Sequence, residues 1–232
     1  MAYELHITRA FVSYESERFP ILGAEVDALV RRQPDLYVPP DAPRRPDFCY
    51  VYWSDNDHYL LFHDGRLSAK RPSPLFKRRM IELASDLDAW VIGDDAEVYE
   101  LDGETVTDRN RARSPLRKHL ITRGDGNPVI RADEWAVLVA AQPDFTTRST
   151  IEAELPSGTR DIPCPPIDCW TGHPSGRPIP FFFNDDEVFN HNEEIEVRDA
   201  DEPTVHRMTE LAAALRAHVV KDHQLSWKTT SG

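Results

Sequence analysis

The chain has few cysteines, few glycines and no long apolar run among its 232 residues. Three cysteines are too few for a disulfide framework, and the odd count is typical of a reducing compartment. No stretch of about 18 apolar residues occurs, so the sequence predicts no membrane-spanning helix. The first residues lack the basic segment and apolar core of a secretory signal. We therefore expect a globular, cytoplasmic protein.

Positive charge is scarce as well. Lys and Arg number 27 against 40 Asp and Glu, which gives a formal net charge of -13. Nucleic-acid affinity depends mainly on Lys and Arg neutralising phosphates, so we expect no nucleic-acid binding. An acidic surface instead raises the rate of encounter with a cationic partner, and it also favours solubility. Composition alone leaves both interpretations of the charge open.

Motifs that carry catalysis are missing too. The sequence contains no Gly-x-Ser-x-Gly, no Walker loop and no Gly-x-Gly-x-x-Gly. His63-Asp64 and Asp222-His223 have the residue types of acid–base pairs, but neighbouring residues of a strand point to opposite faces. We therefore expect neither an enzyme nor a bound cofactor.

Metal binding is not predicted either. Cys164, Cys169, His173 and His191 are ligand types that zinc accepts, but the Cys-x4-Cys spacing lacks a second paired set. Acidic turns such as Asp94-Asp95 are more often solvated than metallated, and no EF-hand spacing is present.

The most informative feature that is present is an internal repeat. The stretch 59–99 returns, edited, at 181–227, and 3–9 returns at 119–123. Four apolar positions of a helical run hold a constant spacing of 128 residues (208 − 80): Met80, Leu83, Ala84 and Leu87 match Met208, Leu211, Ala212 and Leu215.

The periodicity predicts an α+β fold made of two tandem repeats. Each repeat is expected to be a ferredoxin-like βαβ(β)βαβ unit, with two helices on one face of a mostly antiparallel sheet. In the first copy we expect these elements at 3–9, 22–32, 49–53, 59–63, 66–70, 74–88 and 90–93.

Domain boundaries follow from the repeat. The first repeat is expected at 1–103, a basic linker at 104–118 and the second repeat at 119–232. Pro and Gly are frequent at 155–180, which we therefore interpret as a long exposed insertion in the second repeat.

Residues kept in both copies are expected to serve the fold, because both copies solve the same packing problem. Thr8 and Arg9 match Thr122 and Arg123 in this way, and further shared positions are Pro34-Asp35 with Pro143-Asp144 and Asp94 with Asp222. Features found in one copy only are better candidates for function.

An acidic tract of the second copy is the main feature of that kind. Nine carboxylates occur between 184 and 202 against one arginine, Arg198, and aromatic residues precede them. We predict a partner-binding surface with an aromatic anchor, formed by Asp94, Asp95, Trp170, Asp185, Asp186, Glu187, Glu193 and Glu194.

The opening stretch 3–9, Tyr-Glu-Leu-His-Ile-Thr-Arg, and the turn Gly93-Asp94-Asp95 resemble a family of small, mostly uncharacterised bacterial proteins. Its members look like one copy of the unit found here, so the resemblance covers about 1–100 well and the second copy loosely. Some relatives are immunity proteins encoded beside bacterial toxins, and no functional residue carries over. The second copy departs from the pattern, with Lys221-Asp222-His223 at the turn.

These observations favour a non-enzymatic binding protein. The expected function is that of an immunity protein, in which an acidic surface neutralises a cationic antibacterial toxin such as a nuclease. The alternative is a small-ligand sensor or hydrolase with a cleft between the repeats, using His63, His173 or His191. A third possibility is a structural module of a larger homo-oligomeric assembly.

Overall fold

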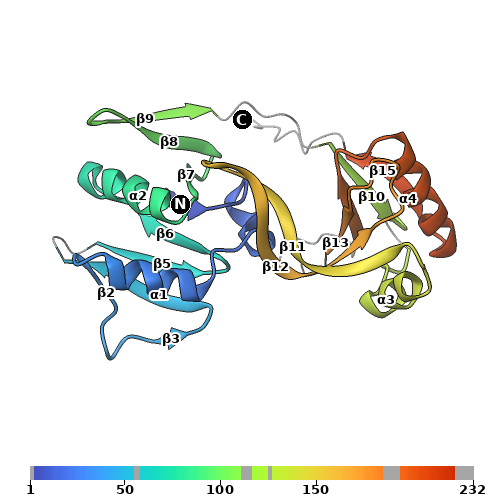
Figure 1. Cartoon of the computed structure of the whole chain (residues 1–232), viewed down its shortest axis with the longest axis horizontal. Helices are drawn as coiled ribbons and strands as arrows, with labels where there is room; N and C mark the ends of the chain where they lie inside the picture. Colours follow the sequence, from blue (N-terminus) through green and yellow to red (C-terminus); the bar gives the residue numbers. More distant parts are fainter. Residues whose placement is uncertain (1–2, 55–57, 111–116, 125–126, 185–193, 223–232) are drawn as a thin grey trace, which may run out of the picture. The chain divides into compact units, whose positions relative to one another are not determined.

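The computed structural model describes residues 3–54, 58–110, 117–124, 127–184 and 194–222 (Figure 1). By their internal contacts the residues form two compact units. Unit 1 contains 1–112 and 149–165, and unit 2 contains 113–148 and 166–232. The expected α+β class is confirmed, because each unit combines helices with a mostly antiparallel sheet. No helix in the described part is both long and apolar enough to cross a membrane.

Unit 1 is built on one large sheet, in which the strand order is β2-β4-β5-β6-β1-β7-β8-β9 and β3 pairs with β4. The strands whose pairing is described all run antiparallel to their neighbours. Its elements are β1 (Glu4–Thr8), η1 (Ser13–Arg18), α1 (Gly23–Arg32), β2 (Leu36–Tyr37), β3 (Arg44–Arg45), β4 (Phe48–Trp53), β5 (Tyr59–His63), β6 (Arg66–Lys70), α2 (Pro74–Asp86), β7 (Trp90–Gly93), β8 (Glu97–Asp102) and β9 (Thr105–Asn110).

The core of unit 1 lies between the sheet and the two helices α1 and α2. Alternation along β1 buries Leu5 and Ile7 on the face that meets the helices. Helix α2 begins after Ser73, whose hydroxyl accepts a hydrogen bond from the Phe76 N–H at 3.3 Å, and Pro74 occupies the first helical position. Its apolar stripe then follows helical spacing into the same core, through Phe76, Met80, Leu83 and Ala84.

Unit 2 contains a smaller sheet with the strand order β11-β12-β13-β14-β10-β15. Trp135 of α3 and Met208 of α4 lie in its core, together with Phe181 and Ile195 from the sheet. The elements are β10 (Lys118–Thr122), α3 (Ala132–Ala140), β11 (Phe145–Leu155), β12 (Gly158–Trp170), β13 (Ile179–Asn184), β14 (Glu194–Arg198), α4 (Glu202–Ala214) and β15 (His218–Asp222).

The stretch 155–180 differs from the expectation of a long exposed connection. Much of it is β12, a 13-residue strand that pairs with β11, and residues 149–165 of this hairpin group with unit 1. Within unit 1 the Trp90 Nε1 donates to the carbonyl oxygen of Glu154 at 3.4 Å. Asp88 accepts from the Ser157 hydroxyl at 2.6 Å and pairs with Arg160 at 2.8 Å. Residues 149–165 of the hairpin are therefore part of unit 1 rather than a free loop, while the outer ends of β11 and β12 belong to unit 2.

The expected linker at 104–118 is also partly wrong. Residues 105–110 form β9, which pairs with β8 along its whole length. The Arg109 guanidinium makes two hydrogen bonds to the Glu100 carboxylate across this pair, at 2.9 and 2.6 Å. Both faces of β9 carry polar residues, so its sequence lacks the alternation of apolar and polar residues that predicts a strand. We therefore interpreted it as a linker.

An arginine at the end of the first strand of each unit makes the same set of contacts. Arg9 donates to the Glu25 carboxylate at 2.9 and 2.7 Å and to the carbonyl oxygen of Leu87 at 2.9 Å. Arg123 donates to the Glu134 carboxylate at 3.2 and 3.1 Å and to the Leu215 carbonyl oxygen at 3.0 Å. The structural role predicted for these two arginines is therefore confirmed.

A second set of contacts also occurs in both units. In unit 1 the Asp35 carboxylate accepts from Trp53 Nε1 at 2.9 Å and from Arg79 at 2.7 Å. In unit 2 the Asp144 carboxylate accepts from Trp170 Nε1 and from Arg207, both at 2.7 Å. Each aspartate thus joins the end of a strand to the long helix of its unit.

Candidate functional site

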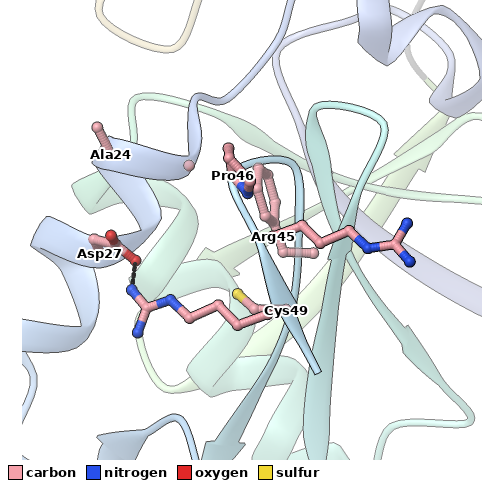
Figure 2. Close-up of a pocket in the computed structure, with 8 residues that line it drawn as sticks. Ala24, Asp27, Arg45, Pro46 and Cys49 are labelled. Atoms are coloured by element: carbon pink, nitrogen blue, oxygen red, sulfur yellow. Dashed lines mark hydrogen bonds and ion pairs between the residues drawn. The ribbon is translucent and has the colours of Figure 1, made fainter. Parts of the chain in front are cut away.

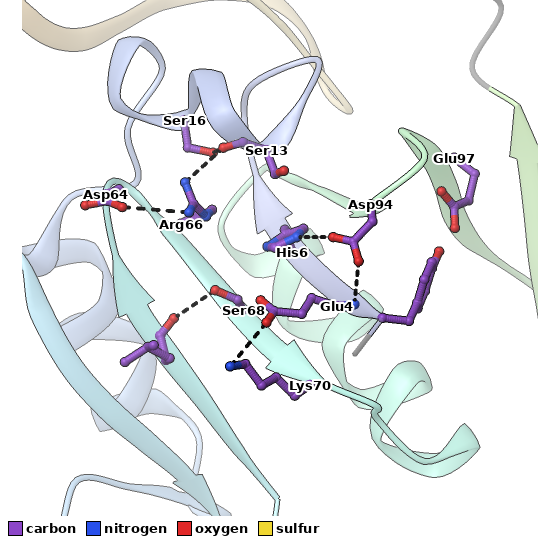
Figure 3. Close-up of polar contacts among 12 residues, drawn as sticks. Glu4, His6, Ser13, Ser16, Asp64, Arg66, Ser68, Lys70, Asp94 and Glu97 are labelled. Atoms are coloured by element: carbon purple, nitrogen blue, oxygen red, sulfur yellow. Dashed lines mark hydrogen bonds and ion pairs between the residues drawn. The ribbon is translucent and has the colours of Figure 1, made fainter. Parts of the chain in front are cut away.

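The polar residues of unit 1 gather on the sheet face that is turned away from α1 and α2. Because Leu5 and Ile7 point to the helices, His6 between them points the other way. Ser68 is the cross-strand partner of His6, and Leu61 is the partner of Ser68 on the next strand. Figure 3 shows His6 and Ser68 side by side with Asp94, Arg66 and Glu4 around them. We call this side of unit 1 the second face.

A serine, a histidine and an aspartate form a chain of hydrogen bonds on the second face. Ser68 Oγ lies 3.2 Å from His63 Nε2, and His63 Nδ1 lies 2.7 Å from the Asp64 carboxylate. We expected His63 and Asp64 to point apart, as neighbours in a strand do. That expectation is wrong because β5 ends at His63 and Asp64 adopts a left-handed turn conformation, with φ 48°.

This chain has the order of groups found in serine hydrolases, but its surroundings differ from an active site. Ser68 is only 4% exposed, and its hydroxyl also lies 3.5 Å from the carbonyl oxygen of Leu61. A nucleophile needs a space where the reacting carbon can sit within about 3 Å of it, beside donors for the developing oxyanion. Two cavities occur among the described residues of unit 1, one beside Gly23 and Cys49 and one beside Arg32 and Asp86, and neither is lined by Ser68 or His63. The arrangement therefore supports a buried polar network better than a catalytic triad.

His6 and Asp94 form a second polar pair beside this chain. His6 Nε2 lies 3.2 Å from one Asp94 oxygen, and the other oxygen accepts from the Glu4 N–H at 2.9 Å. Since a carboxylate can only accept, Nε2 of His6 carries the proton, and its buried Nδ1 has no hydrogen-bond partner among the described residues. Burial lowers the pKa of His6 in spite of the opposing effect of Asp94. The second face thus holds a neutral histidine.

This histidine makes the stability of unit 1 depend on pH. Because the folded pKa of His6 is lowered, the unfolded chain binds the proton first, and stability is lost as pH falls below about 6.5. Replacing His6 by Leu, the residue at the matching position 120 of unit 2, should remove this contribution. We expect the free energy of unfolding, measured with urea, to fall more for the native protein than for H6L when the pH is lowered from 8 to 5. Parallel stability curves for the two proteins would contradict a buried neutral His6.

Five aromatic rings continue the second face toward the β2 edge of the sheet. Alternation along β4 buries Cys49, Val51 and Trp53, so the residues between them point outward. Successive ring centroids lie 5.4, 5.4, 5.5 and 5.7 Å apart, within the usual range for packed aromatic pairs. We call this set the aromatic row, and in spatial order it consists of Phe48, Tyr50, Tyr59, Tyr52 and Tyr37.

The aromatic row is open to solvent. Tyr37 is 48% exposed and Tyr59 is 40% exposed, while the other three rings are half-buried. Contiguous exposed apolar area of this kind is a mark of interaction surfaces, and tyrosine is enriched in them. We did not predict this site from the sequence, although the alternating aromatic residues at 48, 50 and 52 were a visible signal.

The charges beside the aromatic row are mostly neutralised within unit 1. Arg66 lies 3.7 Å from the Asp64 carboxylate, and Lys70 lies 3.5 Å from that of Glu4. Arg45, the cross-strand partner of Phe48, is exposed. The row is therefore a mainly uncharged surface with hydroxyl groups at its margins.

Four of the acidic residues predicted to bind a partner, Asp185, Asp186, Glu187 and Glu193, lie outside the described residues. Glu194 opens β14 and is half-buried.

The other three predicted residues are described, and they have different surroundings. Asp95 is exposed in the turn after β7, while Asp94 beside it binds His6 and the Glu4 N–H. Trp170 is only 7% exposed and packs in the core of unit 2, with its Nε1 bonded to Asp144. A buried indole with a satisfied N–H offers little surface to a partner, so the proposed aromatic anchor is better assigned to the aromatic row.

Two carboxylates after 193, Glu196 and Asp201, have internal partners in unit 2. Glu196 is 2% exposed and pairs with Lys118 at 3.3 Å and with Arg198 at 2.8 Å. Asp201 caps α4 by accepting from Thr204, which holds the pKa of Asp201 below its usual value. These residues stabilise the fold rather than form one continuous acidic surface.

The cysteine and histidine residues that were weighed as zinc ligands, and not predicted to bind zinc, have other surroundings. Cys169 is buried in β12, and His173 Nε2 lies 2.9 Å from the Asp201 carboxylate. Among the described residues no group of three or more His, Cys, Asp or Glu side chains is placed to hold a metal ion. His191 lies outside the described residues.

The fold and the site define an α+β protein that carries an exposed aromatic surface on the second face of unit 1. No family model, curated protein or solved structure matches the chain.

Proposed function

We propose that the protein is a non-enzymatic binding protein that captures a cationic protein partner on the aromatic row of unit 1. The observation that carries the proposal is the run of five packed rings, two of them 40% or more exposed, on the sheet face opposite α1 and α2. Tyrosine rings offer large contact area with little loss of conformational entropy, and their faces attract guanidinium and ammonium groups. Arginine and lysine side chains of the partner are the natural occupants.

The net charge of -13 supports a cationic partner rather than a nucleic acid. Exposed aromatic rings on a sheet can also stack nucleic-acid bases, but such platforms combine stacking with a positively charged groove. Arg66 and Lys70 beside the row are each paired with a carboxylate. An acidic protein repels phosphates and speeds encounter with a basic protein.

A more specific form of this proposal is an immunity protein that neutralises an antibacterial toxin, such as a nuclease, in the cytoplasm. A nuclease must present a cationic surface to its own substrate, and an acidic protein bound there would block it. The resemblance of the first 100 residues to a bacterial family that includes immunity proteins supports the same function. Neutralisation requires binding only, which agrees with the poor accessibility of Ser68.

We also propose that the units are two copies of one ferredoxin-like unit with an added strand. The matching strand orders β6-β1-β7 and β14-β10-β15 support this, with a helix between the equivalent strands. The contacts of Arg9 and Arg123 provide a second, independent likeness. The aromatic row belongs to the first copy, since the strand that matches β4 ends in Cys169 and Trp170 at the positions of Tyr52 and Trp53.

Calorimetric titration with the product of the neighbouring gene tests the proposed function. We expect saturable binding that weakens as salt is raised, because steering by charge is screened within about 10 Å at 0.1 M salt. A single-stranded RNA oligonucleotide serves as the control ligand and should not bind at the same salt concentration. Absence of protein binding at low salt, or tighter binding of the RNA, would overturn the proposal.

A hydrolase is the second candidate, and the Ser68–His63–Asp64 chain is the observation that favours it. An activated serine reacts with a fluorophosphonate probe, so mass spectrometry of the treated protein distinguishes the two functions. We expect no adduct at Ser68, since its hydroxyl is buried. An adduct that forms in the native protein but not in S68A would make the protein an enzyme.

A further inference from the structure

Unit 1 contains a cavity of about 450 Å³ on the helix side of its sheet. It lies between the start of α1, the turn that joins β3 to β4, and the inward face of β4 and β5 (Figure 2). The volume is within the usual range of about 300–1,000 Å³ for small-ligand sites. The aromatic row is on the other face of the sheet, so this cavity is independent of the proposed partner surface.

The floor of the cavity is apolar apart from one thiol. Cys49 and Phe62 are cross-strand partners, and they are 3% and 2% exposed. Figure 2 shows the Cys49 sulfur directed from β4 toward the space between α1 and Pro46. The thiol has no hydrogen-bond partner among the described residues, and burial raises its pKa, so it carries its proton. A buried thiol therefore faces the cavity with its weak donor unused.

The wall of the cavity is the first turn of α1. The residue before the helix is Leu22, which has no side-chain acceptor for the first N–H groups, so those of Gly23 and Ala24 lack a capping side chain. Both residues line the cavity. Gly23 is required there, because a Cβ at this position would lie 2.0 Å from the carbonyl oxygen of Pro46. The positive end of the helix dipole is thus held against the cavity by a close backbone contact.

The Arg44 guanidinium lies at the rim of the cavity. Arg44 extends from β3 to the Asp27 carboxylate on α1, where it forms an ion pair. A guanidinium has five N–H donors, and this pair leaves several of them for another acceptor. The neighbouring Arg45 also lines the cavity, but Figure 2 shows its guanidinium extending away from α1 and Asp27. The cavity residues carry two arginines and one aspartate, a positive balance in a protein of charge -13.

We propose that this cavity binds a small organic anion with a flat apolar body, a carboxylate in the simplest case. The carboxylate would accept from Arg44 and from the first N–H groups of α1, while the apolar body would fill the cavity beside Pro46, above Phe62 and Cys49. Recognition combines two features, since the floor selects an apolar group and the rim selects negative charge.

Titration with benzoate, followed by ¹⁵N NMR of the full chain, tests this proposal. We expect saturable shifts of the Gly23 and Ala24 amides. Inorganic phosphate, which cannot use the floor, should bind at least about ten-fold more weakly. In R44Q the affinity for benzoate should fall about ten-fold or more, whereas the matched variant R45Q should change it less than about three-fold.

A second readout does not depend on a variant. Saturating benzoate should shift the backbone amide signals of Cys49 and Phe62, which line the cavity, but not that of Cys164, which does not line it. The proposal fails if benzoate causes no saturable shift at Gly23 and Ala24. Equal affinity for phosphate would exclude a role for the apolar floor, and equal losses in R44Q and R45Q would exclude a role for the rim.

Discussion

Replacing Arg9 by alanine is expected to destabilise unit 1 by about 3 kcal/mol. The Arg9 side chain is only 2% exposed and connects three parts of the chain. It reaches the Glu25 carboxylate at the start of α1, and it bonds the carbonyl oxygens of Pro20 and Leu87 at 3.1 and 2.9 Å. Removing it leaves two carbonyl groups without a donor, and each buried unsatisfied group costs about 1–3 kcal/mol.

Glu25 determines how this loss depends on pH. Burial acts to raise the pKa of Glu25, but the hydrogen bonds and charge of Arg9 outweigh it, and the pKa lies below the ordinary value. A lowered carboxyl pKa contributes stability above about pH 4.5, which is lost as pH falls through the folded pKa. The stability difference between the native protein and R9A should therefore shrink at pH 3. Glu25 is 36% exposed, so the loss of stability expected for R9A lies at the lower end of the range for breaking a buried ion pair.

Arg123 provides the matched control in unit 2. It makes the equivalent contacts, but its side chain is 16% exposed, so R123A should cost only about 1–2 kcal/mol. Hydrogen exchange measured by mass spectrometry assigns each loss to peptides of one unit. We expect R9A to reduce protection in β1 and α1, and R123A to reduce it in β10 and α3. Equal, small effects of both variants would show that the Arg9 contacts contribute little.

The sequence predicted both α-helices and five strands of unit 1 closely, but it missed η1, β2, β3, β8 and β9. Helical spacing placed one helix at 22–32, where α1 spans Gly23–Arg32, and the strand expected at 66–70 is β6. These elements each bury one apolar face, and that is the property that periodicity detects. The same method failed for β9, whose exposed side chains carry no such pattern.

The β11–β12 hairpin was hidden by its prolines. Pro163, Pro165 and Pro166 lie inside β12, where the sequence indicated a loop. Successive residues of a strand direct their N–H positions to opposite edges, so Pro163 and Pro165 remove donors from one edge and Pro166 removes a donor from the other. The described pairing of β12 with β13 is confined to 168–170, beyond the prolines. A strand with one unpaired edge tolerates proline, which local sequence patterns do not reveal.

The site was harder to predict than the fold. Both faces of β4 and β5 carry aromatic residues. Trp53 and Phe62 point inward, while Tyr52 and Tyr59 point outward. Only the position of the helices decides which set is exposed. Likewise, the interpretation of Trp170 as a surface anchor did not take account of Asp144, a partner 26 residues away that holds its indole in the core. Exposure depends on tertiary contacts, and composition alone does not supply them.

Replacing Tyr59 by alanine is expected to weaken binding of the cationic partner by about 2 kcal/mol, or roughly 30-fold in Kd. Tyr59 occupies the middle of the aromatic row, in contact with Tyr50 at 5.4 Å and Tyr52 at 5.5 Å between ring centroids. Residues near the centre of an interface lose the most water on binding, and they contribute most of its energy. Its 40% exposure means that the substitution leaves the core of unit 1 unchanged.

Two further variants separate the contribution of the ring from other effects in the same calorimetric titration. Y59F keeps the ring and removes only the hydroxyl, so it should lose less than about 1 kcal/mol if stacking dominates. Leu75 of α2 is 57% exposed on the helix layer, and L75A should leave Kd within about two-fold. Equal losses in Y59A and L75A would indicate a general effect of removing apolar surface. Full binding by Y59A would move the interface away from the aromatic row, because a ring in the centre of that row cannot be lost without exposing its neighbours to water.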